Sequence, residues 1–298
     1  MHTYSFPALL LVVSFWAAPL GAQSRPPISY PYAPYMEGKM DPQIAGWPLT
    51  EENRAYILKP RETRVPGLES GSALPDMAPV TPSAGMWKDP NTWINHHTTL
   101  VSVAEANRGP VDIVLIGDSI TQQWGGTRIG TPNFNQHWKR RFGNYKTLNL
   151  GIQGDTTQNI LWRLDHGAMD GLQPRAIVLL IGTNNKPNPK TFTSVGLGVR
   201  LCVDNLRARF PKAQIIFVKV LPVAKEDIRR FNDYLDTLGF SKDPALQVLD
   251  LWDDLVLPDG TTDPDLYIDG NLHLSEAGYE IYAARLEPLL TRALLQTP

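Results

Sequence analysis

The sequence predicts an α/β protein, a three-layer α/β/α sandwich built on a five-stranded parallel sheet. Five short runs are apolar throughout and rich in β-branched residues, which is typical of strands buried on both faces. Longer stretches between them carry apolar residues at every third or fourth position, the pattern of a helix with one buried face. This alternation gives parallel strands covered by helices on both sides. We expect the flavodoxin-like strand order 2-1-3-4-5.

The expected elements follow in chain order. A helix over 91–106 leads into the first strand, and the strands cover 111–116, 145–150, 176–181, 213–221 and 246–251. Further helices are expected over 134–142, 195–210, 226–238 and 276–295, with another that begins at Asp155 or Thr156. In the first helix His96 and His97 are adjacent, so their side chains point about 100° apart and do not share one ion. We expect both to face solvent.

The amino-terminal part of the chain differs in composition from the rest. Residues 1–22 resemble a signal peptide, because the apolar run 8–18 is too short to span a bilayer and small residues follow it. Over 23–90 proline is frequent and periodicity is absent, which indicates a Pro-rich linker or arm. We therefore expect a secreted or periplasmic protein without stable membrane insertion, whose main domain covers 91–298.

Charge and cysteine content exclude several classes of protein. The net charge of the 298 residues is −2, which gives no electrostatic reason to expect a nucleic-acid partner. Cys202 is the single cysteine, so no intrachain disulfide can form, and we expect it to be a small buried residue. Neither G-x-G-x-x-G nor a Walker A loop follows any strand, which disfavours a nucleotide-binding protein. The oligomeric state stays open.

Four polar or flexible positions follow the ends of expected strands or precede the last helix: Ser119, Gly154, Asn184 and His273. In a parallel sheet the carboxyl ends of the strands lie along one edge, so these residues should converge. Acyl transfer needs such a set, since a serine hydroxyl becomes a nucleophile when a histidine takes its proton. The oxyanion that forms needs fixed N–H donors, for which the candidates are the amides of Ser119 and Gly154 and the Asn184 side chain.

The same four positions carry a family resemblance. GDSI at 117–120, the glycine of NLGIQGD, GTNN at 182–185 and the histidine of LHLSEAGY resemble the four blocks of the SGNH or GDSL hydrolase superfamily. Within it, LNLGIQGDTTQNILWRL at 148–164 looks most like the catalytic subunits of intracellular platelet-activating-factor acetylhydrolase. The resemblance covers about residue 90 onward. It implies the SGNH hydrolase fold, Ser119 as nucleophile, His273 as base, Gly154 and Asn184 as oxyanion donors, and no metal or cofactor.

One departure concerns the acid that orients the histidine. The superfamily has D-x-x-H, whereas this chain has Gly270 at that position and its aspartate one residue earlier, at Asp269. We expect Asp269 to serve, with Asp265 as the alternative. A backbone carbonyl that orients His273 is the third option.

The resemblance also suggests the reaction. The small acyl pocket of the acetylhydrolase corresponds to Ile120, Thr183 and Leu272, which implies a secreted serine carboxylic-ester hydrolase with a preference for acetyl esters. The fold does not fix the alcohol part of the ester substrate. Since we expect the protein to be exported, a small-molecule ester such as an acetylated carbohydrate is favoured over a cytosolic phospholipid. The alternatives are a thioesterase or lysophospholipase of the same fold, and a catalytically dead carbohydrate-binding protein.

Overall fold

The structure is a computed structural model that describes residues 90–125, 133–223, 226–268, 270 and 272–296. The predictions of a signal peptide at 1–22 and of a Pro-rich arm that ends at residue 90 concern residues 1–89, which lie outside the described residues. So does the predicted catalytic acid, Asp269.

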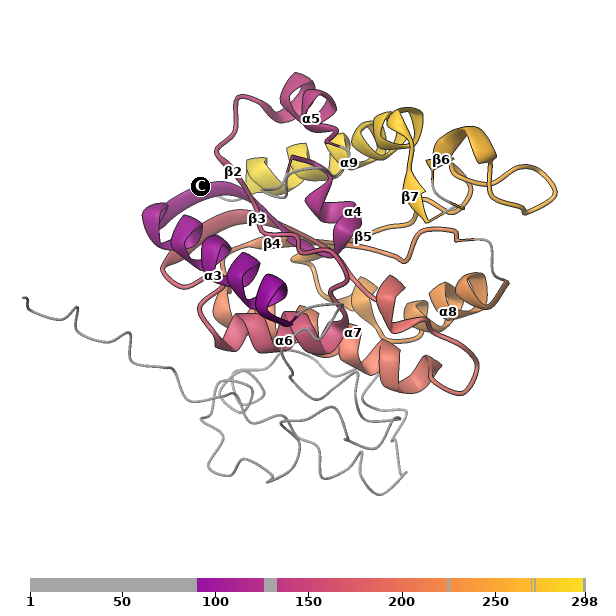
Figure 1. The fold of residues 1–298 in the computed structure, drawn as a ribbon, viewed down its shortest axis with the longest axis horizontal. Helices are drawn as coiled ribbons and strands as arrows, with labels where there is room; N and C mark the ends of the chain where they lie inside the picture. The colour runs from indigo at the N-terminus through magenta and orange to yellow at the C-terminus, as the bar shows by residue number, and fades with distance from the viewer. Residues whose placement is uncertain (1–89, 126–132, 224–225, 269, 271, 297–298) are drawn as a thin grey trace, which may run out of the picture.

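A five-stranded parallel sheet lies at the centre (Figure 1). Its order is β2-β1-β3-β4-β5, as the sequence predicts, and every neighbouring pair is parallel. The strands are β1 (Gly109–Gly117), β2 (Thr147–Asn149), β3 (Leu172–Leu180), β4 (Gln214–Val218) and β5 (Leu246–Leu249). The carboxyl ends of these strands therefore share one edge, which is where open α/β sheets bind ligands.

Helices cover both faces of the sheet (Figure 1). One layer consists of α3 (Pro90–Ala106), α6 (Thr157–Asp165), α7 (Phe192–Arg209) and α8 (Glu226–Asp236). The other contains α5 (Asn135–Phe142) and α9 (Glu276–Gln296). The short α4 (Ser119–Gln122) follows β1, and a small antiparallel hairpin of β6 (Tyr267–Ile268) and β7 (His273–Leu274) precedes α9. The predicted three-layer sandwich is confirmed.

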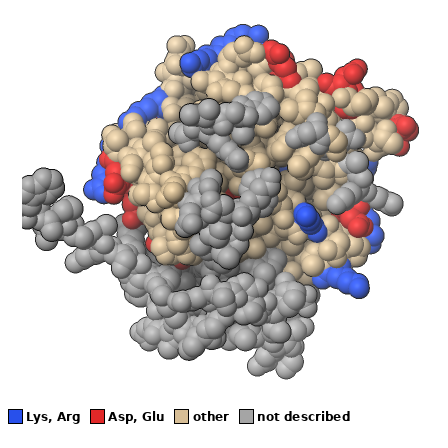
Figure 2. All heavy atoms as spheres, in the orientation of Figure 1, with Lys and Arg blue, Asp and Glu red and all other residues tan. Residues whose placement is uncertain are grey.

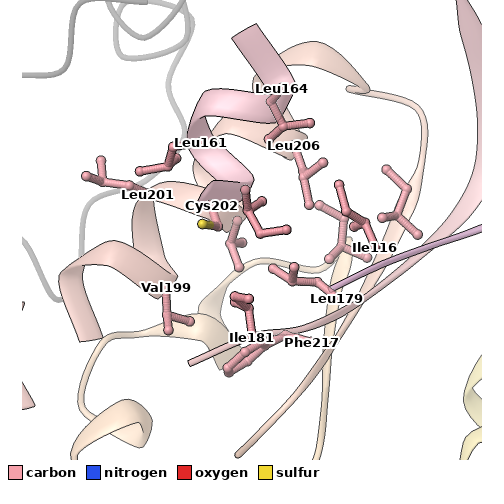
Figure 3. Close-up of a cluster of buried hydrophobic side chains, with 14 of the residues drawn as sticks. Ile116, Leu161, Leu164, Leu179, Ile181, Val199, Leu201, Cys202, Leu206 and Phe217 are labelled. Atoms are coloured by element: carbon pink, nitrogen blue, oxygen red, sulfur yellow. The ribbon is translucent and has the colours of Figure 1, made fainter. Parts of the chain in front are cut away.

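Alternate residues of each strand enter different cores. In β1, Val114 and Ile116 face the layer that contains α3, whereas Ile113 and Leu115 face α5 and α9. This explains why the strands are apolar throughout. Cys202 is fully buried in the first of these cores, near Ile116 and Phe217, as predicted (Figure 3).

The prediction that His97 faces solvent is wrong. His97 is 5% exposed, because its ring packs against those of Trp93 and Trp162 at centroid distances of 5.8 and 5.1 Å. Burial lowers the pKa of His97 to about 3, so this imidazole is neutral. The short strand β6, which the sequence did not predict, pairs with the strand that carries His273.

Charged side chains are paired rather than gathered by sign. Figure 2 shows basic and acidic atoms near one another at the top of the molecule, where Figure 1 places α5. There Arg141 of α5 contacts Glu280 and Glu287 of α9, each at 2.5 Å. In the part of the chain that the structure describes, no helix combines the length and the apolar character needed to cross a bilayer.

Candidate active site

Ser119 lies on a tight turn at the end of β1. Asp118 begins α4, and its Oδ1 accepts a hydrogen bond from the Ile120 amide at 3.0 Å, so Ser119 is the first helical residue. Gly117 makes this turn possible, because a Cβ atom there would lie 2.3 Å from the carbonyl oxygen of Leu180 on β3. The turn is held from the other side by Tyr279, whose hydroxyl donates to the Ile120 carbonyl at 2.6 Å.

His273 reaches Ser119 from the other end of the domain's sequence. It lies on β7, where its register partner is Ile268 of β6, and it is 8% exposed. Its Nε2 atom lies 2.8 Å from the Oγ of Ser119. At that distance a neutral imidazole with its proton on Nδ1 can accept a hydrogen bond from the Ser119 hydroxyl. General-base catalysis requires this geometry.

The loop after β2 runs beside the Ser119 turn. The Ile152 amide donates to the Gly117 carbonyl at 3.0 Å, and the Gln153 amide donates to Oε1 of Gln122 at 2.8 Å. Gly154 follows with φ of +83°, a conformation that favours glycine. Within the described part of the chain, the backbone N–H groups of Ser119 and Gly154 donate no hydrogen bond. Both donors are therefore available to a bound group.

Asn184 joins these two segments. It lies in a 3₁₀ turn, η3 (Thr183–Asn185), after β3. Its Nδ2 donates to the backbone carbonyl of Asp155 at 3.0 Å and lies 3.4 Å from Oδ2 of Asp118. The structure thus brings together three segments that follow different strands, and places Asn184 beside the neighbours of both Gly154 and Ser119.

A buried ion pair supports this arrangement from behind. The Asp155 carboxylate accepts from Nη1 of Arg163 at 2.6 Å and from Nε1 of Trp93 at 2.7 Å. Arg163 also donates to the Leu150 carbonyl at 2.5 Å, and the side chains of Asp155 and Arg163 are both 0% exposed. Burial raises the pKa of Asp155 to about 6, although the neighbouring guanidinium opposes this shift. Sequence reasoning did not assign these residues any role at the site.

Asp118 is a second buried carboxyl group at this site. It is 1% exposed, and burial raises its pKa to about 7, with a smaller contribution from the charge of Asp155. Among the described residues no group of three or more His, Cys, Asp or Glu side chains could hold a metal ion. The residues that the structure brings together here offer a hydroxyl, an imidazole and directed N–H donors.

Comparison with known proteins agrees with this geometry. Residues 115–281 match the model of the GDSL-like lipase/acylhydrolase family. The chain belongs to this family. It is a GDSL-type esterase, a hydrolase that acts on carboxylic ester bonds.

The relatives of this GDSL-type esterase cover most of its described part. It is 32% identical over 211 residues to the platelet-activating factor acetylhydrolase IB subunit alpha1 of Bos taurus. The aligned region covers 68% of this chain and 84% of the relative. The human alpha2 subunit is 30% identical, over 69% of this chain and 86% of the relative. A solved structure from Streptococcus, described provisionally as a platelet activating factor, has a TM-score of 0.54 at 22% identity, over 66% of this chain and 92% of that one. This last similarity supports the fold.

The remaining site residues of the GDSL-type esterase are placed as follows. Ile120 is 1% exposed and Thr183 is 8% exposed, and each is adjacent in sequence to a candidate oxyanion donor. Leu272 is 40% exposed, which is more than expected of a residue that closes an acyl pocket. Asp265 lies in a short turn, η5 (Pro264–Leu266), where its carbonyl accepts from the Ser275 hydroxyl at 2.7 Å. The role of each residue in catalysis stays a prediction.

Proposed function

We propose that this esterase removes short acyl groups, acetyl above all, from an alcohol by way of a covalent Ser119 intermediate. The observation that carries the proposal is the 2.8 Å contact between Ser119 Oγ and His273 Nε2. A hydroxyl is a weak nucleophile unless a base accepts its proton, and here that base is already in contact.

The residues of the site divide the reaction into two steps. In the first, Ser119 attacks the acyl carbon while its proton moves to Nε2 of His273. The tetrahedral intermediate collapses, and the departing alcohol oxygen takes that proton from the imidazolium. In the second, a water molecule attacks the acyl-enzyme with the same imidazole as base. The carboxylic acid leaves and the Ser119 hydroxyl is restored.

Three N–H groups are proposed to bind the oxyanion of each intermediate. They are the backbone amides of Ser119 and Gly154 and the second proton of Asn184 Nδ2. The first Nδ2 proton is used in the 3.0 Å bond to Asp155, whereas the contact with Asp118 Oδ2 is long, at 3.4 Å. Because that second contact is long, we propose that the second proton remains available to a developing negative charge in the orientation that the Asp155 bond fixes.

An acid is proposed to orient the imidazole. Asp269 is the next residue after Ile268, and Ile268 is the register partner of His273 in the β6–β7 hairpin. This proximity along the chain supports Asp269 as the third member of a Ser-His-Asp triad. Asp265 and a backbone carbonyl remain the alternatives.

The acyl preference and the alcohol rest on different grounds. The relatives are named as acetylhydrolase subunits, which supports acetyl as the acyl group. The alcohol part of the relatives' substrate is not assumed for this chain, because the fold and the catalytic residues do not determine it. We propose an acetylated carbohydrate, on the expectation from residues 1–22 that the chain is exported to the periplasm or beyond the cell.

A series of p-nitrophenyl esters tests the proposed function. The purified protein should hydrolyse the acetate ester with higher kcat/KM than the octanoate ester, and Ser119→Ala should abolish both activities. Ser119→Thr serves as a second variant of similar size. Better turnover of the octanoate ester would favour a lysophospholipase, and preferred cleavage of acyl thioesters would favour a thioesterase. Absence of hydrolysis by the wild-type protein would favour the carbohydrate-binding alternative.

A further inference from the structure

Gln122 is a buried polar residue of α4 that the catalytic scheme above does not use. It is the last residue of the short helix that begins at Ser119, and it is 2% exposed. Its Oε1 atom accepts a hydrogen bond from the backbone amide of Gln153 at 2.8 Å. Gln153 immediately precedes Gly154 in the sequence. One side chain therefore connects the helix of the nucleophile to the neighbour of a proposed oxyanion donor.

The loop that carries Gly154 is fixed by its own backbone amides. Over residues 150–155, every amide except that of Gly154 donates a hydrogen bond within the described part of the chain. Those of Leu150 and Ile152 donate to carbonyls of β1, at 2.8 and 3.0 Å. The N–H of Gly154 belongs to the peptide unit that joins Gly154 to Gln153, so fixing Gln153 restricts the direction of this N–H. A donor for a transient oxyanion needs this combination of a free N–H and a fixed direction.

The same loop packs closely against α4. A Cβ atom on Gly151 would lie 2.5 Å from the backbone nitrogen of Gln122, and Nδ2 of Asn149 donates to a carbonyl of α4 at 2.8 Å. These contacts hold the start of the loop. Within the described residues, the bond from Gln153 to Gln122 is the last hydrogen bond between α4 and the loop before Gly154.

We propose that Gln122 is a positioning residue for the oxyanion site. By holding the Gln153 amide, it directs the N–H of Gly154 toward the oxygen of the acyl group. The inference rests on the proposed function, because it takes Gly154 as an oxyanion donor. On the other side of Gly154, the Asn184 side chain holds the Asp155 carbonyl at 3.0 Å. The free N–H thus lies between two residues that are each held by a side-chain amide.

Three substitutions separate the acceptor atom from the bulk of the side chain. Gln122→Met is of similar length and lacks the acceptor. Gln122→Glu keeps an oxygen acceptor and replaces Nε2, which has no partner within the described residues. Gln123→Met is the matched control, because Gln123 is 4% exposed and its Oε1 accepts from the Tyr279 hydroxyl at 3.1 Å, away from the loop. Thermal denaturation confirms that each variant is folded at the assay temperature.

Steady-state kinetics with p-nitrophenyl acetate test the positioning role. Gln122→Met should lower kcat by about tenfold, less than the loss of a whole donor costs, and leave KM within about twofold, because the oxyanion develops only in the transition state. Gln122→Glu should recover most of this kcat, and Gln123→Met should stay within about twofold of the wild-type protein. An unchanged kcat in Gln122→Met, an equal loss in Gln123→Met, or no recovery in folded Gln122→Glu would overturn the inference.

Hydrogen exchange measured by mass spectrometry separates this inference from the proposed function, because it needs no turnover. Peptides that cover residues 151–155 should exchange faster in Gln122→Met than in the wild-type protein or in Gln123→Met, since the Gln153 amide loses its acceptor. Equal exchange in the three proteins would overturn the inference even if esters are hydrolysed. If exchange rises as expected and the wild-type protein hydrolyses no ester, Gln122 does hold the loop, and the proposed function is what fails.

Discussion

Asn184 donates a 3.0 Å hydrogen bond to the backbone carbonyl of Asp155, the residue that follows Gly154. This bond fixes the positions of two proposed oxyanion donors, Gly154 and Asn184, relative to each other, although they follow different strands. The side chain of Asp155 is fixed in turn by Arg163 and Trp93. The position of the proposed oxyanion site is thus coupled to a buried ion pair.

Replacement of Asn184 by alanine tests its proposed role as an oxyanion donor. Asn184→Ala should lower kcat for p-nitrophenyl acetate by about 10²–10³, as for loss of one such donor, with little change in KM. Asn185→Ala is the matched control, because the Asn185 side chain contacts Thr157 and Gln158 instead. An equal loss of kcat in both variants would indicate a structural effect and count against the assignment.

Removal of the guanidinium of Arg163 should destabilise the fold. Arg163→Met leaves the Asp155 carboxyl buried without its cation, a change that costs about 3–5 kcal/mol in free energy of unfolding. Urea denaturation measures this loss. The exposed pair of Arg108 and Glu105 is the comparison, and Arg108→Ala should cost less than about 1 kcal/mol. The double variant Asp155→Asn/Arg163→Met should recover part of the stability, and no recovery would contradict the pairing.

The buried carboxyl of Asp118 should make stability depend on pH. Burial raises the pKa of Asp118 to about 7 from its ordinary value of 3.8, so between these values the folded state keeps a proton that the unfolded state releases. The free energy of unfolding should then fall as pH rises from 4 to 7, by up to about 1.4 kcal/mol per pH unit for this group. Asp118→Asn keeps an acceptor for the Ile120 amide and should flatten this slope. Denaturation curves at several pH values with the same slope in both proteins would contradict the burial of an ionisable Asp118.

The strand order could be predicted from the sequence because each strand is apolar on both faces and is followed by a helical pattern. The start of β3 could not be predicted from the sequence. Residues 172–175 contain Pro174 and Arg175, which predict a boundary, yet β3 begins at Leu172. Here β3 pairs with β1 alone, because pairing with β4 begins at Ala176. An edge position tolerates a proline that lacks an N–H.

The four converging positions of the site could also be predicted, because strand ends meet at one edge. The ion pair that supports the site could not be predicted, since nothing in the sequence shows that Asp155 and Arg163 are buried together. The burial of His97 did have a signal. Trp93, His97 and Leu100 recur at helical spacing, and all three are buried.

The identity of the orienting acid can be settled by a comparison of two aspartates. Asp269→Asn should lower kcat by about 10⁴, as expected when the imidazole is left in the wrong tautomer. Asp265→Asn should leave kcat within twofold. The reverse result would assign the role to Asp265, and full activity in both variants would indicate that a backbone carbonyl orients His273.

The central claim is that Ser119 is activated by His273 and becomes acylated. Labelling with a fluorophosphonate, followed by mass spectrometry of the digested protein, tests this most directly. The account predicts one adduct, on Ser119, that forms at the rate at which esterase activity is lost and is much slower in His273→Ala. An adduct on another residue, or full esterase activity in protein that is labelled at Ser119, would contradict it.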